Sequence, residues 1–231
     1  MCEMKNERSI YFMPALLREL QKEFNHNYIQ GPGLIRNYEG LPFFIYSNDI
    51  DIVSEFQHRN TIDSIFKKVA LKLNLECKRY SSMYYTFKYL FSGCNEKLEI
   101  DLNFSFNWYG VDFFRIEDLY EYQTTQDGFS IFGTDEQRAF ITFCHSFLYG
   151  GFINSRYIRL FSNYAHTPVF KWHMFDVFGS DALTLLSYIS NCNSDIASQK
   201  ANRIRLKAIL RKIIKNPLTF VKNFTNLFLI H

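Results

Sequence analysis

Apolar residues in the first part of the chain recur with the period of a helix. Leu16, Leu17, Leu20 and Phe24 fall on one side, which predicts a helix over Pro14–Phe24. A second helix is predicted after Asn60, a suitable N-cap, because apolar residues again recur at three- and four-residue spacing: Ile62, Ile65, Phe66, Val69, Ala70 and Leu73. Each helix therefore has one face that needs a partner.

Other segments alternate between apolar and polar residues, as half-buried strands do. The clearest is 49–53, which reads D-I-D-I-V, and the Gly- and Pro-rich stretch 28–42 fits a short strand between turns. Further strands are predicted at Glu76–Arg79, Tyr84–Phe91, Lys97–Phe104 and Val111–Phe114. The turn residues 92–95 make the two strands on either side of them a hairpin.

After about residue 130 the pattern becomes helical. Thr134 and Gln137 have the spacing of a capping box, and helices are expected at 155–164, 179–190 and 199–215. Asn216 and Pro217 suit the N-cap and first position of a final helix. We therefore predict an α+β fold with a small mixed sheet and flanking helices over 1–130, followed by a helical region over 131–231 that ends in a basic amphipathic tail, 199–231.

Charge divides the chain unevenly. The net charge is +3, yet residues 200–231 contain eight Lys or Arg and no Asp or Glu, which leaves a net charge of −5 on the rest. This asymmetry suggests an anionic partner surface. The tail has two interpretations: its apolar stripe lies on an anionic membrane, or it packs against the domain and exposes only its lysines.

Compartment is indicated by what the sequence lacks. Its five cysteines include no C-x-x-C pair, the polar N-terminal residues do not resemble a signal peptide, and no apolar run is long enough to span a bilayer. We expect a cytoplasmic protein, with peripheral attachment to the inner face of the membrane if the tail binds lipid.

Three acidic residues are candidates for chemistry. Asp49 and Asp51 share one face of a strand because side chains alternate, and Asp101 lies in a second alternating segment, L-E-I-D-L-N-F. Adjacent carboxylates repel each other and favour a divalent cation, and Mg²⁺ or Mn²⁺ prefers such oxygen ligands. The plainer interpretation is an acidic pair on the solvent face of an edge strand.

Four further residues are candidates for substrate binding. Arg36 can bind a phosphate or pair with Glu39, while Ser47 and Asn48 can position phosphate or simply form a turn. Arg156 can contact substrate or make a surface ion pair.

Six short motifs of the chain belong together: L-I-R-N-Y-E-G-L-P (34–42), S-N-D-I-D-I-V (47–53), L-E-I-D-L (98–102), W-Y-G-V (108–111), Y-G-G-F-I-N-S-R-Y-I (149–158) and the Asn-Pro pair at 216–217. In this order they resemble the nucleotidyltransferase-fold proteins of bacterial surface-polysaccharide (capsule and O-antigen) loci. Two departures stand out. Bulky Phe43 and Phe44 occupy the place of the Gly-Ser pair that cradles a triphosphate, and Tyr109 replaces an arginine of that family's W-R-G turn.

The resemblance implies a metal-dependent transfer of a nucleotidyl or phosphoryl group from a phosphorylated or nucleotide-linked donor to a sugar or glycan acceptor. Asp49 and Asp51 would hold Mg²⁺ or Mn²⁺, and Asp101 would be a third ligand or the base. The missing Gly-Ser pair keeps two alternatives open: a catalytically silent binding or regulatory protein, and a standalone nucleotidylating enzyme of the antitoxin type. No nucleic-acid partner is expected, because no RNA- or DNA-binding module is present.

Overall fold

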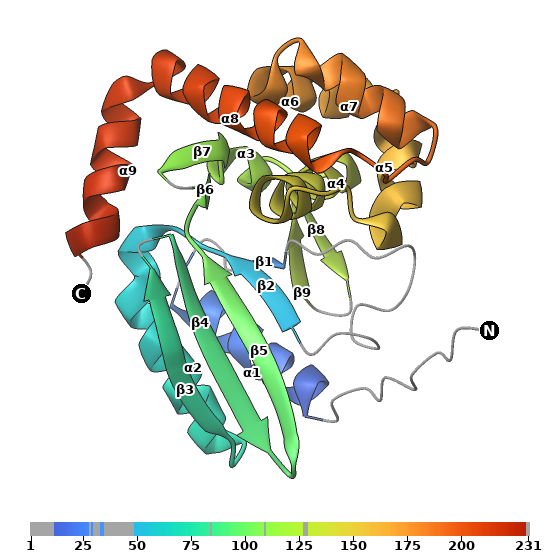
Figure 1. Ribbon diagram of the computed structural model, residues 1–231. Helices are drawn as coiled ribbons and strands as arrows, with labels where there is room; N and C mark the ends of the chain where they lie inside the picture. Colours follow the sequence, from blue (N-terminus) through green and yellow to red (C-terminus); the bar gives the residue numbers. More distant parts are fainter. Residues whose placement is uncertain are drawn as a thin grey trace. The chain divides into compact units, whose positions relative to one another are not determined.

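The computed structural model describes residues 12–27, 29, 33–34, 49–83, 85–108, 110–126 and 129–229. They form two compact units: unit 1, Met1–Phe104 with Tyr120–Phe132, and unit 2, Ser105–Leu119 with Gly133–His231. The chain is an α+β protein with a mixed sheet, flanking helices and a helical second half, as predicted (Figure 1).

Unit 1 is built on a mixed sheet. Seven strands of the described residues pair in the order β3-β4-β5-β2-β1-β9-β8, with parallel pairing between β2 and β5 and between β1 and β9. The strand bounds are β1 Gly33–Leu34, β2 Asp49–Val53, β3 Glu76–Met83, β4 Thr86–Gly93, β5 Glu96–Asn103, β8 Gln123–Gln126 and β9 Phe129–Phe132. The predicted strand at 49–53 and the predicted hairpin across residues 92–95 are both confirmed.

Helices α1 (Met13–His26) and α2 (Arg59–Lys72) bury their apolar faces in one core with the sheet. The ring of Phe66 lies edge-on to those of Tyr89 and Phe91, at centroid distances of 4.7 and 5.6 Å. Such pairs add about 0.5–1.5 kcal/mol each beyond the area that they bury. The predicted N-cap Asn60 was wrong, because a short 3-10 turn, η1 (Phe56–His58), starts the helix earlier.

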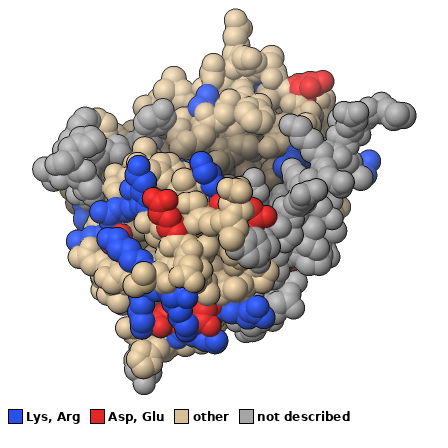
Figure 2. All heavy atoms as spheres, turned by 90° about the horizontal axis from the view of Figure 1, so that it is seen from below, with Lys and Arg blue, Asp and Glu red and all other residues tan. Residues whose placement is uncertain are grey.

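The outer sides of α1 and α2 are tied by ion pairs. Lys72 Nζ lies 2.5 Å from Glu19 Oε2, and Lys68 Nζ lies 2.7 Å from Glu23 Oε2. On the face drawn in Figure 2, basic and acidic side chains are interspersed. That mixture is typical of a solvated surface whose charges balance locally.

Unit 2 contains a hairpin and a set of helices. The hairpin is β6 (Phe106–Trp108) with β7 (Val111–Phe114). The helices are α3 Glu117–Tyr120, whose last residue belongs to unit 1, α4 Asp135–Cys144, α5 Ile158–Tyr164, α6 Pro168–Phe178, α7 Asp181–Ser190, α8 Ser198–Lys215 and α9 Pro217–Leu229. A π-helical turn, η2 (His145–Gly150), extends α4, and a 3-10 turn, η3 (Ser155–Tyr157), precedes α5.

Local sequence signals set several boundaries in unit 2. Thr134 and Gln137 form the predicted capping box, with Gln137 N donating to Thr134 Oγ1 over 3.2 Å. Pro217 begins the last helix, as predicted. Helix α6 and strands β8 and β9 were not predicted. In the part of the chain that the structure describes, no helix is long and apolar enough to cross a membrane.

Candidate functional site

The central feature of unit 1 is the parallel pairing of β2 with β5. In this register Asp51 lies directly opposite Asp101, and Asp49 lies opposite Glu99. Neighbouring strands are about 4.8 Å apart, and side chains of partner residues project from the same face. The register thus places Asp101 beside Asp51 across the pair of β2 and β5.

The two faces of these strands differ in character. Ile50 and Ile52 of β2, and Ile100 and Leu102 of β5, are buried in the core with α1 and α2. Because side chains alternate along a strand, Asp51 and Asp101 project from the opposite face, and both are only partly buried. The apolar residues of D-I-D-I-V and E-I-D-L therefore hold the acids in place by fixing the register.

A lysine on the next strand neutralises part of this acidic face. Lys88 is the register partner of Asp101 on β4, and its Nζ lies 2.6 Å from Asp101 Oδ2 and 3.2 Å from Glu99 Oε1. Burial alone would lower the pKa of Lys88, but its hydrogen bonds to Asp101 and Glu99 outweigh burial and raise that pKa. Lys88 is therefore a permanent cation beside the acids at neutral pH.

Asp51 is held by an amide. Asn103 Nδ2 lies 3.3 Å from Asp51 Oδ1 and 3.3 Å from the backbone oxygen of Asp101. Thr86 Oγ1 donates to Asn103 Oδ1 over 2.8 Å, which fixes which way the amide points. Thr86 and Asn103 together thus hold the carboxylate of Asp51 in one orientation.

Glu99 is a further acid of this face. Glu99 forms a hydrogen bond with Tyr80 of β3, which lies at a β-bulge between Arg79 and Ser81 where the register of β3 shifts. Burial raises the pKa of Tyr80 to about 12, and a hydrogen bond with Glu99 adds to the rise. Burial opposes ionisation of Glu99, but hydrogen bonds from Tyr80 and Lys88 lower its pKa overall. Glu99 is therefore ionised at neutral pH.

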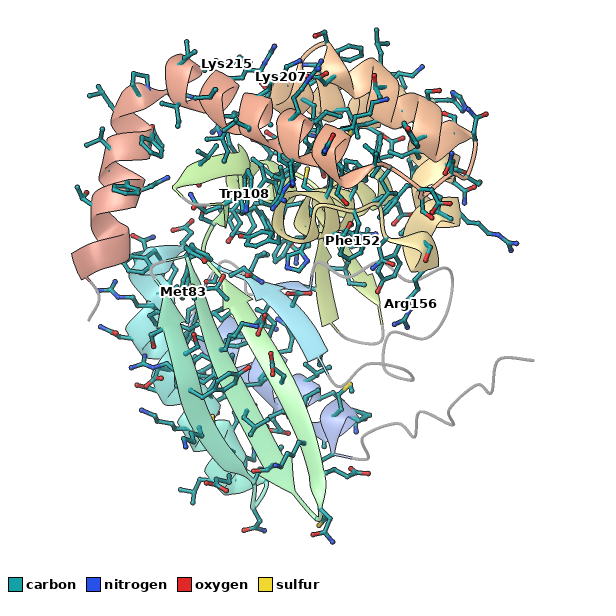
Figure 3. The ribbon with its side chains drawn as sticks, in the orientation of Figure 1. Met83, Trp108, Phe152, Arg156, Lys207 and Lys215 are labelled. Atoms are coloured by element: carbon teal, nitrogen blue, oxygen red, sulfur yellow. The ribbon has the colours of Figure 1, made fainter. Side chains whose placement is uncertain are left out.

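The remaining predicted residues are distributed as follows. The backbone of Asp49 lies in β2, whereas its side chain is outside the described residues. Arg36, Ser47 and Asn48 also lie outside them. Arg156 belongs to unit 2, on η3, where its side chain is exposed and its guanidinium lies 5.7 Å from the ring centre of Tyr157 (Figure 3).

The donor set suits a hard cation. Asp51 and Asp101 offer carboxylate oxygens side by side, the ligand type that Mg²⁺ and Mn²⁺ prefer. Among the described side chains, no group of three His, Cys, Asp or Glu is arranged to hold a metal ion. The third predicted ligand, Asp49, has its side chain outside the described residues.

Three residues of this site were not predicted: Lys88, Asn103 and Glu99. The sequence feature that could have revealed Lys88 is the hairpin turn between β4 and β5. Gly93 pairs with Glu96 across the two-residue turn Cys94-Asn95, and that register alone places Lys88 opposite Asp101. Both turn residues have positive φ, 49° and 68°, as a type I′ turn requires.

Unit 2 has a cavity of about 430 Å³, a volume typical of small-molecule sites. Trp172, His173, Asp176 and Lys212 contribute to its wall. Lys212 and Lys215 in its wall both contact Asp176. Burial lowers the pKa of His173 to about 4, so its imidazole is neutral. The acidic face of unit 1 is therefore the stronger candidate for chemistry.

Comparisons with known proteins add little. No protein-family profile matches the chain, and no curated protein matches its sequence. A solved structure described as a "putative nucleotidyltransferase from H. pylori" aligns over 90% of this chain and 95% of that chain, at 10% identity and a TM-score of 0.30. A similarity this distant assigns neither family nor activity, so the chemistry rests on the residues themselves.

Proposed function

We propose that this protein is a metal-dependent transferase of a nucleotidyl or phosphoryl group, with Asp49, Asp51 and Asp101 as ligands of Mg²⁺ or Mn²⁺. The observation that carries the proposal is the parallel register that sets Asp51 opposite Asp101. A bound divalent ion supplies charge neutralisation for the phosphoryl oxygens. The sugar or glycan acceptor rests on the sequence motifs of the surface-polysaccharide proteins.

The residues of the chain have distinct roles in this proposal. Asp51 and Asp101 present oxygens to the ion, and Asn103 keeps Asp51 in its orientation through the contact at 3.3 Å. Lys88 keeps positive charge at the edge of the site, where the phosphate of a donor would lie. Arg36, Ser47 and Asn48, which precede β2 in the sequence or lie next to it, remain candidates for binding the donor.

A second candidate function is a catalytically silent binding protein. The contact that favours it is Lys88 with Asp101, because the fold already supplies one of the acids with a counter-ion. In that case the acids persist as part of a structural ion-pair network. The two candidates differ in whether a divalent ion binds at all.

Calorimetric titration with Mn²⁺ and Mg²⁺ separates them. We expect wild type to bind the ion, with tighter binding in the presence of one member of a panel of nucleotides and nucleotide sugars. Asp51→Asn and Asp101→Asn should each abolish binding. Glu76→Gln is the matched control, since it removes an exposed carboxylate from the same sheet. Absence of binding by wild type with every ligand would overturn the transferase proposal.

Turnover is then tested with the ligand that tightens metal binding. The protein, the ion and that donor are incubated with a panel of sugars, and release of pyrophosphate or a nucleoside monophosphate is followed. We expect release that requires both Asp51 and Asp101. Metal binding without release by any donor would favour the silent alternative.

A further inference from the structure

Helix α8 has a buried side and an apolar exposed side. Ala201, Ile204 and Ala208 are buried against unit 2. Leu206, Leu210 and Ile214, which recur every four residues and so lie along one side of the helix, are 57%, 50% and 79% exposed. This is the reverse of what a surface helix needs, because its outward side should be polar.

Helix α9, which follows the break at Asn216, also exposes apolar residues. Leu218, Val221 and Phe224 are also largely exposed, and they are spaced three residues apart. Together the two helices carry what we call the C-terminal apolar face: Leu206, Leu210, Ile214, Leu218, Val221 and Phe224. Exposed apolar residues that gather on two consecutive helices are typical of an interaction site.

Ion pairs and hydrogen bonds fix the orientation of α8. Lys207 and Lys215 both belong to α8 (Figure 3). Lys207 Nζ lies 3.1 Å from Asp181 Oδ2 of α7, and Lys215 Nζ lies 2.8 Å from Asp176 Oδ1 of α6. Arg205 Nε donates to the backbone oxygen of Leu148 over 2.9 Å. These contacts hold the polar flanks of α8 against α6, α7 and η2 and leave its apolar side exposed.

Charge indicates what covers this face. Residues 200–231 contain eight Lys or Arg and no Asp or Glu, and three of the eight, Lys207, Lys212 and Lys215, pair with aspartates of α6 and α7. Arg203 and Lys222 are exposed beside the apolar residues of α8 and α9. A second copy of the chain would bring the same positive charges together, which is unfavourable, whereas an anionic bilayer offers both apolar depth and negative charge.

We propose that the C-terminal apolar face binds the surface of an anionic membrane. Its leucine, isoleucine, valine and phenylalanine side chains enter the boundary between headgroups and acyl chains, and the flanking cations stay at the level of the headgroups. Both helices lie along the membrane surface. The binding is independent of the proposed transfer reaction and would place that reaction at the membrane.

Co-sedimentation with vesicles tests the proposal. One set of vesicles is phosphatidylcholine alone, and the other is phosphatidylcholine mixed with phosphatidylglycerol. We expect the full chain to bind the anionic vesicles and to be released by high salt, which screens surface charge. Binding to neither type of vesicle would overturn the proposal.

Variants locate the surface. The triple change Leu206→Ser, Leu210→Ser and Ile214→Ser should abolish vesicle binding. The matched control changes exposed leucines of other helices, Leu71→Ser in α2 and Leu183→Ser in α7, and should bind as wild type does. Arg203→Gln with Lys222→Gln should weaken binding roughly fivefold for each cation removed. These two residues are exposed, so this variant tests the proposal even if the triple variant fails to fold.

Two further outcomes are informative. Sedimentation velocity without lipid measures self-association; association that the triple change abolishes, together with no vesicle binding, would assign the face to a second copy and overturn the proposal. Asp51→Asn should bind vesicles like wild type. If the protein binds vesicles but no metal, the membrane proposal stands and the transferase proposal fails.

Discussion

Lys88 Nζ lies 2.6 Å from Asp101 Oδ2, and the two residues are register partners on β4 and β5. This contact defines the electrostatics of the acidic face, because Asp101 in turn lies opposite Asp51 on β2. A cation of the protein and a divalent ion would compete for the same carboxylate. The competition can be measured.

Lys88→Met should tighten Mn²⁺ binding by about tenfold, since the ion no longer displaces an ammonium group from Asp101. Without metal, the same change should lower the free energy of unfolding by about 1–2 kcal/mol, a value between those of exposed and buried ion pairs. Calorimetry and urea unfolding check the two effects. Lys78→Met, at an exposed position of β3, is the control and should change neither.

Thr86→Val should lower stability by about 1 kcal/mol, because the hydroxyl of Thr86 donates to Asn103 Oδ1 over 2.8 Å. The loss should shrink in a chain that already carries Asn103→Ala, where the acceptor is gone. Urea unfolding of the four proteins of this cycle measures the coupling. Equal losses in both backgrounds would mean that Thr86 does not act through the amide.

Replacing the turn residues Cys94-Asn95 with Asn-Gly should stabilise the protein. Both residues have positive φ, which Asn and Gly adopt more easily than Cys and Asn do. Cys94→Asn with Asn95→Gly should raise the free energy of unfolding by about 1 kcal/mol. Cys94→Ala keeps the unfavourable backbone and should give no gain. An unchanged urea midpoint for the Asn-Gly variant would argue against this conformation.

His173 should make stability depend on pH. Burial lowers its pKa from 6.5 to about 4, so the unfolded chain binds a proton between these values and the folded chain does not. The effect of His173 on the free energy of unfolding is therefore most favourable above pH 6.5. As the pH falls towards 4, this free energy decreases by at most roughly 3 kcal/mol. His173→Phe should remove the dependence, since the ring packs between Phe114 and Phe140. Unfolding curves from pH 7 to 4 test it.

The sequence predicts those elements whose pattern is local and complete. Strand β2 has the predicted bounds because each apolar residue of D-I-D-I-V is buried in unit 1. Helix α6 was missed because apolar and aromatic residues occur all round it, which removes the helical period. Strand β8 reads Q-T-T-Q and has no apolar residue to reveal it.

The candidate site was predictable only in part, for a related reason. Spacing places Asp49 and Asp51 on one face of β2, and an alternating strand places Asp101 on one face of β5. Lys88 and Asn103 carry no motif, since their relation to the acids arises from register between strands. A pairing shifted by one residue would send Lys88 to the apolar face.

The order in which the sheet assembles follows from its pairing. Lys88 and Asp101 are 13 residues apart and meet within a hairpin, which forms quickly because the loop to be closed is short. Asp51 reaches Asp101 only when β2 joins this hairpin from much farther along the chain, a slower step. We therefore expect Asp101 to gain its ammonium partner before its acidic one during folding. The two acids would then come together against a hairpin that already carries a compensating positive charge.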